Sequence, residues 1–261
     1  MRKKKHKKLL KRTRHQRRTV VVLSMLCSIL ASCDGDAPLG STAASEEITF
    51  SASDGVTLSG RLFGPGEGSA GVVLAHMFPS DQSAWFAFAE RLGQQGYRVL
   101  TFNFRGYCPG GAAGCSQGEK TISAIWQDVE GAIAALREEG VSRIGLVGAS
   151  MGGTASLVAA SKEGQEIDAL VTLSAPIGFE GLEASREVLA QVTAAKLFLA
   201  GHEDTTATEA VDTLYAETLQ PKRPMILTTG DHGTDILTGN QAGIASTEII
   251  KWLERYLPVD A

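Results

Sequence analysis

The sequence predicts an α/β fold in which a mostly parallel central sheet carries helices on both faces. Two observations predict it. Short, continuous apolar runs such as "AGVVLAH" and "AKLFLAG" recur along the chain, and such runs are typical of strands buried on both faces. Segments with helical apolar spacing lie between these runs. Strands that alternate with helices form a parallel sheet whose two faces the helices cover.

The first half of the fold begins with a predicted hairpin, in which "EEITFSA" and "GVTLSGRLFGP" flank a turn at Asp54-Gly55. The runs "AGVVLAH", "YRVLTFNF" and "RIGLVG" predict the next three strands. Between them, "SAWFAFAERLGQQG" predicts a helix that ends at Gly96. The segment "TISAIWQDVEGAIAALREEG" predicts a second helix, because one helical stripe holds its apolar residues Ile122, Ile125, Trp126, Val129, Ile133 and Leu136.

The second half continues the alternation. A helix is predicted to start at Ser150, and "DALVTLS", "AKLFLAG" and "PMILTTG" predict three more strands. About 20 residues separate the first two of these strands, and within them "FEGLEASREVLAQV" predicts one helix. The segment "IASTEIIKWLERYL" predicts the closing helix. Residues 47–261 therefore form one predicted domain, which is large enough for a well-buried core.

The N-terminus has the pattern of an export signal. A basic stretch precedes the 14-residue apolar run "TVVVLSMLCSILAS", which is short for a membrane span, and Cys33 follows it. "LASC" resembles the lipobox of bacterial lipoproteins, which implies cleavage before Cys33 and lipidation of its thiol. An ordinary signal peptide or an uncleaved anchor is the alternative. We expect residues 1–33 to be the leader, residues 34–46 to be a flexible tether, and the domain to be lipid-anchored in the cell envelope, outside the cytoplasm.

The charge of the chain disfavours two kinds of partner. Residues 1–33 hold 11 of the 25 Lys and Arg and none of the 29 Asp and Glu, so residues 34–261 carry 14 basic and 29 acidic side chains, a formal charge of −15. A surface of this charge repels nucleic acid and anionic lipid. Membrane contact is therefore expected through the N-terminal lipid alone.

Two further cysteines lie in "RGYCPGGAAGCSQGE". An exported chain meets an oxidising environment, so Cys108 and Cys115 are predicted to form a disulfide near the rim of the active site. A metal site is the alternative, but the spacing does not suit zinc and no histidine is nearby.

The segment "GLVGASMGGTASL" contains the candidate nucleophile. Gly148-Ala149-Ser150-Met151-Gly152 is a G-x-S-x-G pattern between a predicted strand and a predicted helix. Such a turn lifts the serine hydroxyl out of the sheet, and side chains two residues away on either side would collide. The helix that follows points free N–H groups and its positive dipole end at the site.

A serine hydroxyl needs a base, and three histidines follow the leader: His76, His202 and His232. His232 follows the last strand and is the predicted base, whereas His76 is expected to shape a loop and His202 is a weaker candidate. The base in turn needs an acid to hold its tautomer. Asp204, which follows "AKLFLAG", is the predicted acid, and Glu203 and Asp231 are its rivals.

The order Ser150, Asp204, His232 resembles that of the α/β-hydrolase family, over about residues 48–257. "VVLAHMFPSDQSAW" is similar to the family's oxyanion loop, with Met77 in place of the usual glycine, and this similarity implies that the N–H groups of Phe78 and Met151 form the oxyanion hole. "FNFRGY" is similar to the Asp-x-Arg-Gly turn, with Asn103 in place of the aspartate. The family inserts its caps after the sixth strand, where this chain is short, so a minimal cap and an open site are implied.

The likeness is greatest to small, dienelactone-hydrolase-like esterases, although that subgroup uses a cysteine nucleophile. Together these features predict a serine esterase that acts on small-molecule, short-chain esters through an acyl-enzyme and needs no metal or organic cofactor. Two alternatives remain open: an acyltransferase or peptidase with the same triad, and a non-catalytic binding lipoprotein on a hydrolase fold.

Overall fold

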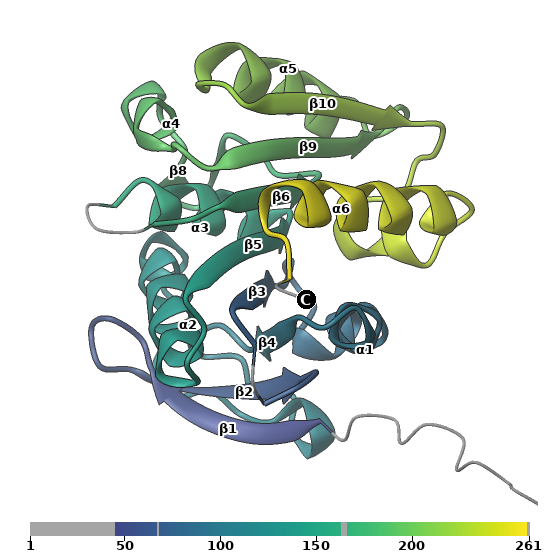
Figure 1. Ribbon diagram of the computed structural model, residues 1–261. Helices are drawn as coiled ribbons and strands as arrows, with labels where there is room; N and C mark the ends of the chain where they lie inside the picture. The colour runs from purple at the N-terminus through teal and green to yellow at the C-terminus, as the bar shows by residue number, and fades with distance from the viewer. Residues whose placement is uncertain (1–44, 67, 163–165, 260–261) are drawn as a thin grey trace, which may run out of the picture. The chain divides into compact units, whose positions relative to one another are not determined.

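The computed structural model describes residues 45–66, 68–162 and 166–259. The predicted leader with Cys33, and the predicted tether up to residue 44, lie outside these residues. Eight strands form one sheet in the order β1-β2-β4-β3-β5-β6-β9-β10 (Figure 1). The strands are β1 (Glu46–Ser51), β2 (Thr57–Phe63), β3 (Ala70–Ala75), β4 (Arg98–Phe102), β5 (Arg143–Ala149), β6 (Ala169–Leu173), β9 (Ala195–Gly201) and β10 (Lys222–Leu227).

The pairing of the strands confirms a mostly parallel sheet. Strand β2 runs antiparallel to both β1 and β4, and every other neighbouring pair is parallel. All residues of β3, β4, β6 and β9 are buried. This burial explains why these strands read as continuous apolar runs rather than as alternating patterns.

Helices cover both faces of the sheet, as predicted. Helices α1 and α6 pack on one face, and α2, α3 and α5 pack on the other (Figure 1). Their bounds are α1 (Phe86–Gln94), α2 (Trp126–Glu138), α3 (Met151–Ala160), α5 (Thr205–Glu217) and α6 (Ala242–Tyr256). Short 3-10 segments lie at Gln82–Trp85, Gly111–Ala113, Ile122–Ala124 and Gly233–Leu237.

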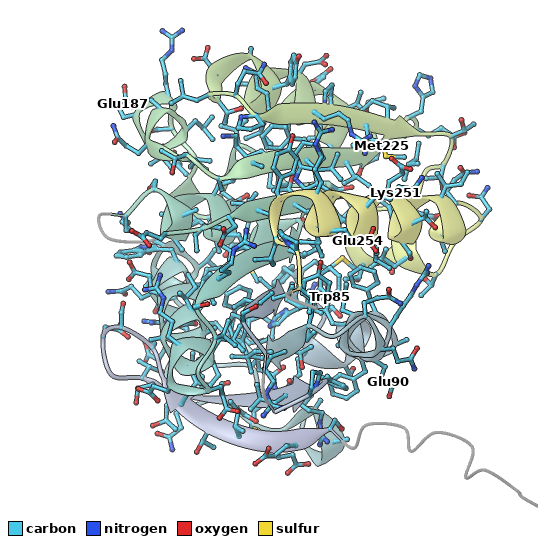
Figure 2. The ribbon with its side chains drawn as sticks, viewed as in Figure 1. Trp85, Glu90, Glu187, Met225, Lys251 and Glu254 are labelled. Carbon is cyan, nitrogen blue, oxygen red and sulfur yellow. A yellow bond between two sulfur atoms is a disulfide. The ribbon has the colours of Figure 1, made fainter. Side chains whose placement is uncertain are left out.

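Each face of the sheet has its own apolar core. Trp85 and Leu92 are fully buried in the core beneath α1 and α6, and Ile133 and Leu146 in the core beneath α2 and α3. Charged side chains such as Glu90, Glu187 and Lys251 point outward around these layers (Figure 2). The apolar stripe of each amphipathic helix therefore packs against the sheet, and its charged side faces outward.

The segment between β6 and β9 corrects one prediction. The helix expected over residues 179–192 forms only as α4 (Arg186–Gln191), capped by the Ser185 side chain. The preceding residues form a two-stranded hairpin, β7 (Gly178–Phe179) and β8 (Leu182–Glu183). Its turn residues Glu180 and Gly181 have φ of +45° and +83°, the backbone of a tight hairpin turn and not of a helix. The segment remains a small cap.

Across the described residues, no helix is both long and apolar enough to cross a membrane.

Candidate active site

Ser150 sits on a strained turn at the carboxyl end of β5. Its backbone has φ +48° and ψ −119°, which L-residues rarely adopt, and α3 begins at the next residue. The Ser150 N–H donates to the Leu173 carbonyl of neighbouring β6 (2.8 Å), which holds the turn against the sheet. Backbone strain of this kind is concentrated at functional sites, where the surrounding structure maintains it.

The two glycines of the G-x-S-x-G pattern are required by close backbone contacts. A Cβ at Gly148 would lie 2.4 Å from the Gly152 carbonyl oxygen, and a Cβ at Gly152 would lie 2.4 Å from the Ala75 carbonyl oxygen. Both contacts are with backbone, which cannot move aside. Any side chain at these positions would therefore collide, as expected from the sequence, and the two glycines let the strand turn directly into the helix.

The structure brings together the three residues that the sequence singled out. His232 Nε2 lies 2.8 Å from Ser150 Oγ, and His232 Nδ1 lies 2.6 Å from Asp204 Oδ2. The Asp204 side chain also caps α5, because its Oδ1 accepts from the Ala207 N–H at 3.4 Å. The helix N-terminus thus stabilises the negative charge of the carboxylate that faces the imidazole.

The rival residues lie elsewhere. Asp231 Oδ2 accepts a hydrogen bond from Thr229 Oγ1 (2.7 Å), and His202 is an exposed side chain of the β9–α5 loop. His76 is fully buried and contacts the loop after β3, as the loop-shaping role predicts. Among the described residues, Asp204 is the one carboxylate that accepts a hydrogen bond from His232.

Two backbone N–H groups, one in the loop after β3 and one at the start of α3, remain available as donors. Those of Phe78 and Met151, the predicted oxyanion donors, make no hydrogen bond with any other described residue. Met151 is the first residue of α3, so its N–H lies at the positive end of the ten-residue helix. An oxyanion hole requires free N–H donors, so both groups remain candidates for that role.

His76 holds the loop that carries Phe78. Its Nδ1–H donates to the Met77 carbonyl (2.9 Å), and its Nε2 accepts from the Phe104 N–H (3.1 Å), so the ring is neutral and has one defined tautomer. The ring packs against Phe104 and Tyr107, with centroids 4.8 and 4.7 Å away. Burial lowers the pKa of His76 to about 4.

Met77, which stands where the family has glycine, joins two parts of the site. A Cβ at Gly233 would lie 2.5 Å from Met77 Sδ, so the methionine side chain packs directly on the residue after His232. Gly233 has φ +58°, which also favours glycine. The oxyanion loop and the histidine loop are therefore in contact, a feature that the sequence did not reveal.

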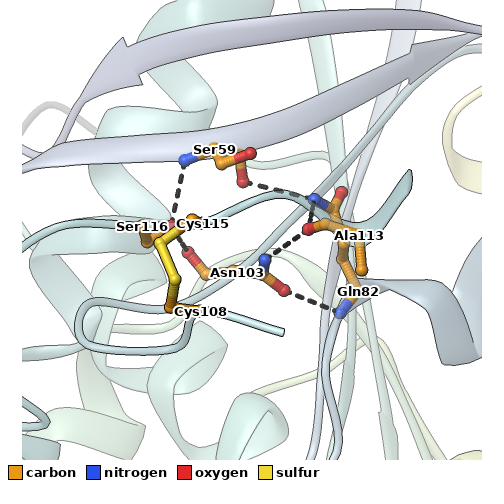
Figure 3. The surroundings of a disulfide bond; sticks show 7 residues. All are labelled: Ser59, Gln82, Asn103, Cys108, Ala113, Cys115 and Ser116. Atoms are coloured by element: carbon orange, nitrogen blue, oxygen red, sulfur yellow. Dashed lines mark hydrogen bonds between the residues drawn. A yellow bond between two sulfur atoms is a disulfide. The ribbon is translucent and has the colours of Figure 1, made fainter. Parts of the chain in front are cut away.

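The predicted disulfide between Cys108 and Cys115 is confirmed, and a buried polar network anchors the loop that it closes (Figure 3). Asn103 Oδ1 accepts from the Gln82 N–H (3.0 Å), and Asn103 Nδ2 donates to the Ala113 carbonyl. Ser116 Oγ donates to the Asn103 carbonyl at 2.7 Å. The Asn103 amide both donates and accepts hydrogen bonds here, which an ionised aspartate cannot do. Asparagine in place of the aspartate of the Asp-x-Arg-Gly turn therefore suits this neutral network.

The disulfide loop does not line the cleft beside Ser150, contrary to its expected place at the rim. It reaches the site through Tyr107, whose ring packs on His76. Arg105, in the same turn, forms a bidentate pair with Asp54 (2.7 and 2.9 Å) and contacts the fully buried Asp128 (2.6 Å). These contacts tie the turn after β4 to α2 and to the β1–β2 hairpin.

A cleft of about 300 Å³ opens beside Ser150. Its lining residues are Phe78, Ser150, Ser174, Pro176, Phe179, Asp204, Thr206, Ala207 and His232. No group of three or more His, Cys, Asp or Glu side chains able to hold a metal ion occurs among residues 45–66, 68–162 and 166–259.

Comparison with known proteins places this geometry in a family. The family model for the alpha/beta hydrolase fold matches residues 72–247. No protein of curated function matches the chain at the level of sequence. Two similar solved structures have TM-scores of 0.68: an esterase from Pyrococcus furiosus (20% identity, 83% of this chain and 92% of that chain) and a dienelactone hydrolase from Anabaena variabilis (19%, 83% and 100%).

A thermophilic esterase from Thermogutta terrifontis, solved with malate bound, has a TM-score of 0.64 at 19% identity and covers 81% of this chain and 99% of its own. At these identities the likeness establishes the fold, and the predicted fold class is confirmed.

Proposed function

Because the chain belongs to the alpha/beta hydrolase fold family, we propose that it is a serine hydrolase that cleaves short-chain carboxylic esters. One observation carries the proposal: a continuous hydrogen-bonded chain from Ser150 Oγ through His232 to Asp204, with distances of 2.8 and 2.6 Å. Nucleophile, base and orienting acid are within hydrogen-bonding distance of one another, the arrangement that activates a serine.

In the proposed reaction, Ser150 Oγ attacks the ester carbonyl carbon while His232 Nε2 takes the hydroxyl proton. Asp204 stabilises the imidazolium through Nδ1–H. The N–H groups of Phe78 and Met151 bind the oxyanion of the tetrahedral intermediate. When the intermediate collapses, His232 protonates the leaving alcohol, and the acyl group stays on Ser150. A water molecule deprotonated by His232 then releases the carboxylic acid.

The size of the cleft supports small substrates. At about 300 Å³, the cleft lies at the lower end of the range of about 300–1,000 Å³ that small-molecule pockets cover. The cap between β6 and β9 is a two-residue-strand hairpin and a six-residue helix, too little chain to enclose a long acyl tunnel. A long acyl chain would leave methylene groups in water, and each exposed methylene would lose the stabilisation of about 0.8 kcal/mol that burial gives.

Covalent labelling with a fluorophosphonate, paired with ester hydrolysis, tests the proposal. Ser150→Ala should lose the label and lower hydrolysis of a butyrate ester by about 10⁴-fold or more. Ser174→Ala removes a second serine of the same cleft and is the matched control, which should keep the label. Labelling without hydrolysis of any ester would favour acyl transfer to another acceptor or a peptidase. Absence of labelling in the wild type would favour the binding-protein alternative.

We also propose that the chain is exported and lipid-anchored through Cys33. The support is the sequence "LASC" at the end of the apolar run, together with the formation of a disulfide by the remaining cysteine pair. Mass spectrometry of the mature N-terminus should find a lipidated Cys33. An unmodified terminus at any other residue would contradict the anchor.

A further inference from the structure

The cleft beside Ser150 has one apolar wall that the proposed reaction does not use. Phe78 and Phe179 both line the cleft, and their ring centroids are 5.8 Å apart at an interplanar angle of 45°. They come from different parts of the chain, the loop after β3 and the β7–β8 hairpin. Pro176 and Ala207 add further apolar surface to the same cleft.

The Phe78 side chain belongs to neither apolar core of the described residues. Its side chain is 46% exposed, and it belongs to the few large apolar side chains that are exposed within the described part of the chain. Leaving a phenyl ring in water forgoes the stabilisation that burial would give. Phe179, by contrast, is half-buried and packs against the core beneath α2 and α3, so it is held in place.

The spacing of the two rings defines how a ligand can bind. A flat ring placed between them would need about 3.5 Å on each side, or about 7 Å in all. Their centroids are closer than this, so the two rings form one continuous wall and cannot sandwich a ligand ring between them. A ligand ring can stack on or meet the edge of that wall, and it would cover the exposed face of Phe78.

The charges of the cleft restrict the ligand further. No lysine or arginine occurs among the described residues that line it, and Asp204 contributes a carboxylate. Glu180, at the exposed tip of the hairpin, directly follows Phe179. A substrate that carries its own carboxylate would meet like charge without a cationic partner.

We propose that the Phe78–Phe179 wall is a binding subsite for a neutral aromatic ring on the substrate, so that the preferred substrates are small, uncharged esters with an aryl group on the acyl or the alcohol side. This inference rests on the proposed ester hydrolysis and adds the class of substrate. Phe179 is its specificity-determining residue, since Phe78 acts in the reaction through its backbone.

Matched ester pairs test the subsite by titration of the released acid. Benzyl acetate is compared with cyclohexylmethyl acetate for the alcohol side, and methyl phenylacetate with methyl cyclohexylacetate for the acyl side. Within each pair the leaving group has similar chemistry and only the ring differs. We expect kcat/KM to be about threefold to tenfold higher for the aromatic member of at least one pair, the gain typical of aromatic contacts. That pair identifies the side that binds. A carboxylate in the para position of benzyl acetate should lower kcat/KM by about tenfold.

Phe179→Leu should abolish the aromatic preference, measured as the ratio of kcat/KM within each ester pair, because leucine keeps an apolar side chain on β7 but presents no aromatic face. Tyr215→Leu, an exposed aromatic on α5 outside the cleft, is the control and should keep the preference. If Phe179→Leu does not fold, benzyl alcohol should slow fluorophosphonate labelling of the wild type more than cyclohexylmethanol does.

Equal kcat/KM within both pairs, or an aromatic preference unchanged in folded Phe179→Leu, would overturn the subsite while leaving the esterase proposal intact. Equal protection by the two alcohols would overturn it in the same way. Failure of the wild type to hydrolyse any ester would instead refute the proposed function.

Discussion

Protonation of His76 should destabilise the folded protein in mild acid. The ring is fully buried between Phe104 and Tyr107, and both of its nitrogens are hydrogen-bonded in the neutral form. Burial is the largest cause of its lowered pKa; the nearby charge of Asp81 acts to raise the pKa and that of Lys120 to lower it. A protonated ring would have no lone pair to accept the Phe104 N–H.

The size of the effect follows from the shift in pKa. The pKa falls from 6.5 in the unfolded chain to about 4 in the folded protein. Between these values the unfolded state binds a proton that the folded state does not, so stability is complete above pH 6.5 and declines as the pH falls toward 4. Between about pH 7.5 and 4.5, His76 alone should cost about 2–3 kcal/mol of unfolding free energy.

Urea denaturation of the wild type and His76→Asn at these two pH values measures the effect. Asparagine keeps a donor and an acceptor but cannot take up a proton. The carboxylates of the protein titrate in both proteins, so the difference between the two pH dependences isolates the histidine. The wild type should lose about 2–3 kcal/mol more than the variant on acidification. An identical pH dependence in the two proteins would refute this account of the His76 environment.

Three further outcomes can be measured by chemical or thermal denaturation. Replacing Cys108 and Cys115 by serine should lower the unfolding free energy by about 2–3 kcal/mol through loss of loop closure, and an unchanged value would contradict this. Arg105→Ala leaves Asp128 buried without its partner and should cost about 3–5 kcal/mol, whereas a loss under 1 kcal/mol would show that water replaces the guanidinium. Glu180→Asn should raise the melting temperature, because asparagine tolerates the positive φ of the hairpin turn, and a lower melting temperature would argue against that turn.

The sequence predicted the sheet well because its strands are buried on both faces. Runs such as "AKLFLAG" depend only on local composition, and their place in the sheet follows from the alternation with helices. The site could be found for a related reason: Ser150, Asp204 and His232 each follow a strand, and the ends of parallel strands share one edge of the sheet.

What the sequence did not reveal depends on contacts between distant segments. The β7–β8 hairpin was predicted as helix because its apolar spacing fits both structures, and the Glu180-Gly181 turn was the one local signal against a helix. The contact of Met77 with Gly233 and the Phe78–Phe179 wall each join residues far apart in the chain. No pattern within a single segment carries such information.

The backbone conformation of Ser150 also sets stability against catalytic activity. With φ +48° and ψ −119°, the position suits glycine better than any residue with a side chain. Ser150→Gly should therefore yield a more stable but inactive protein. In a laboratory library screened only for survival on heating, glycine should accumulate at this position. In a library screened for turnover, serine should persist there in spite of the strain. Comparing the frequencies of glycine and serine at position 150 in the two screens would show how much stability the protein loses by keeping a hydroxyl at the end of β5.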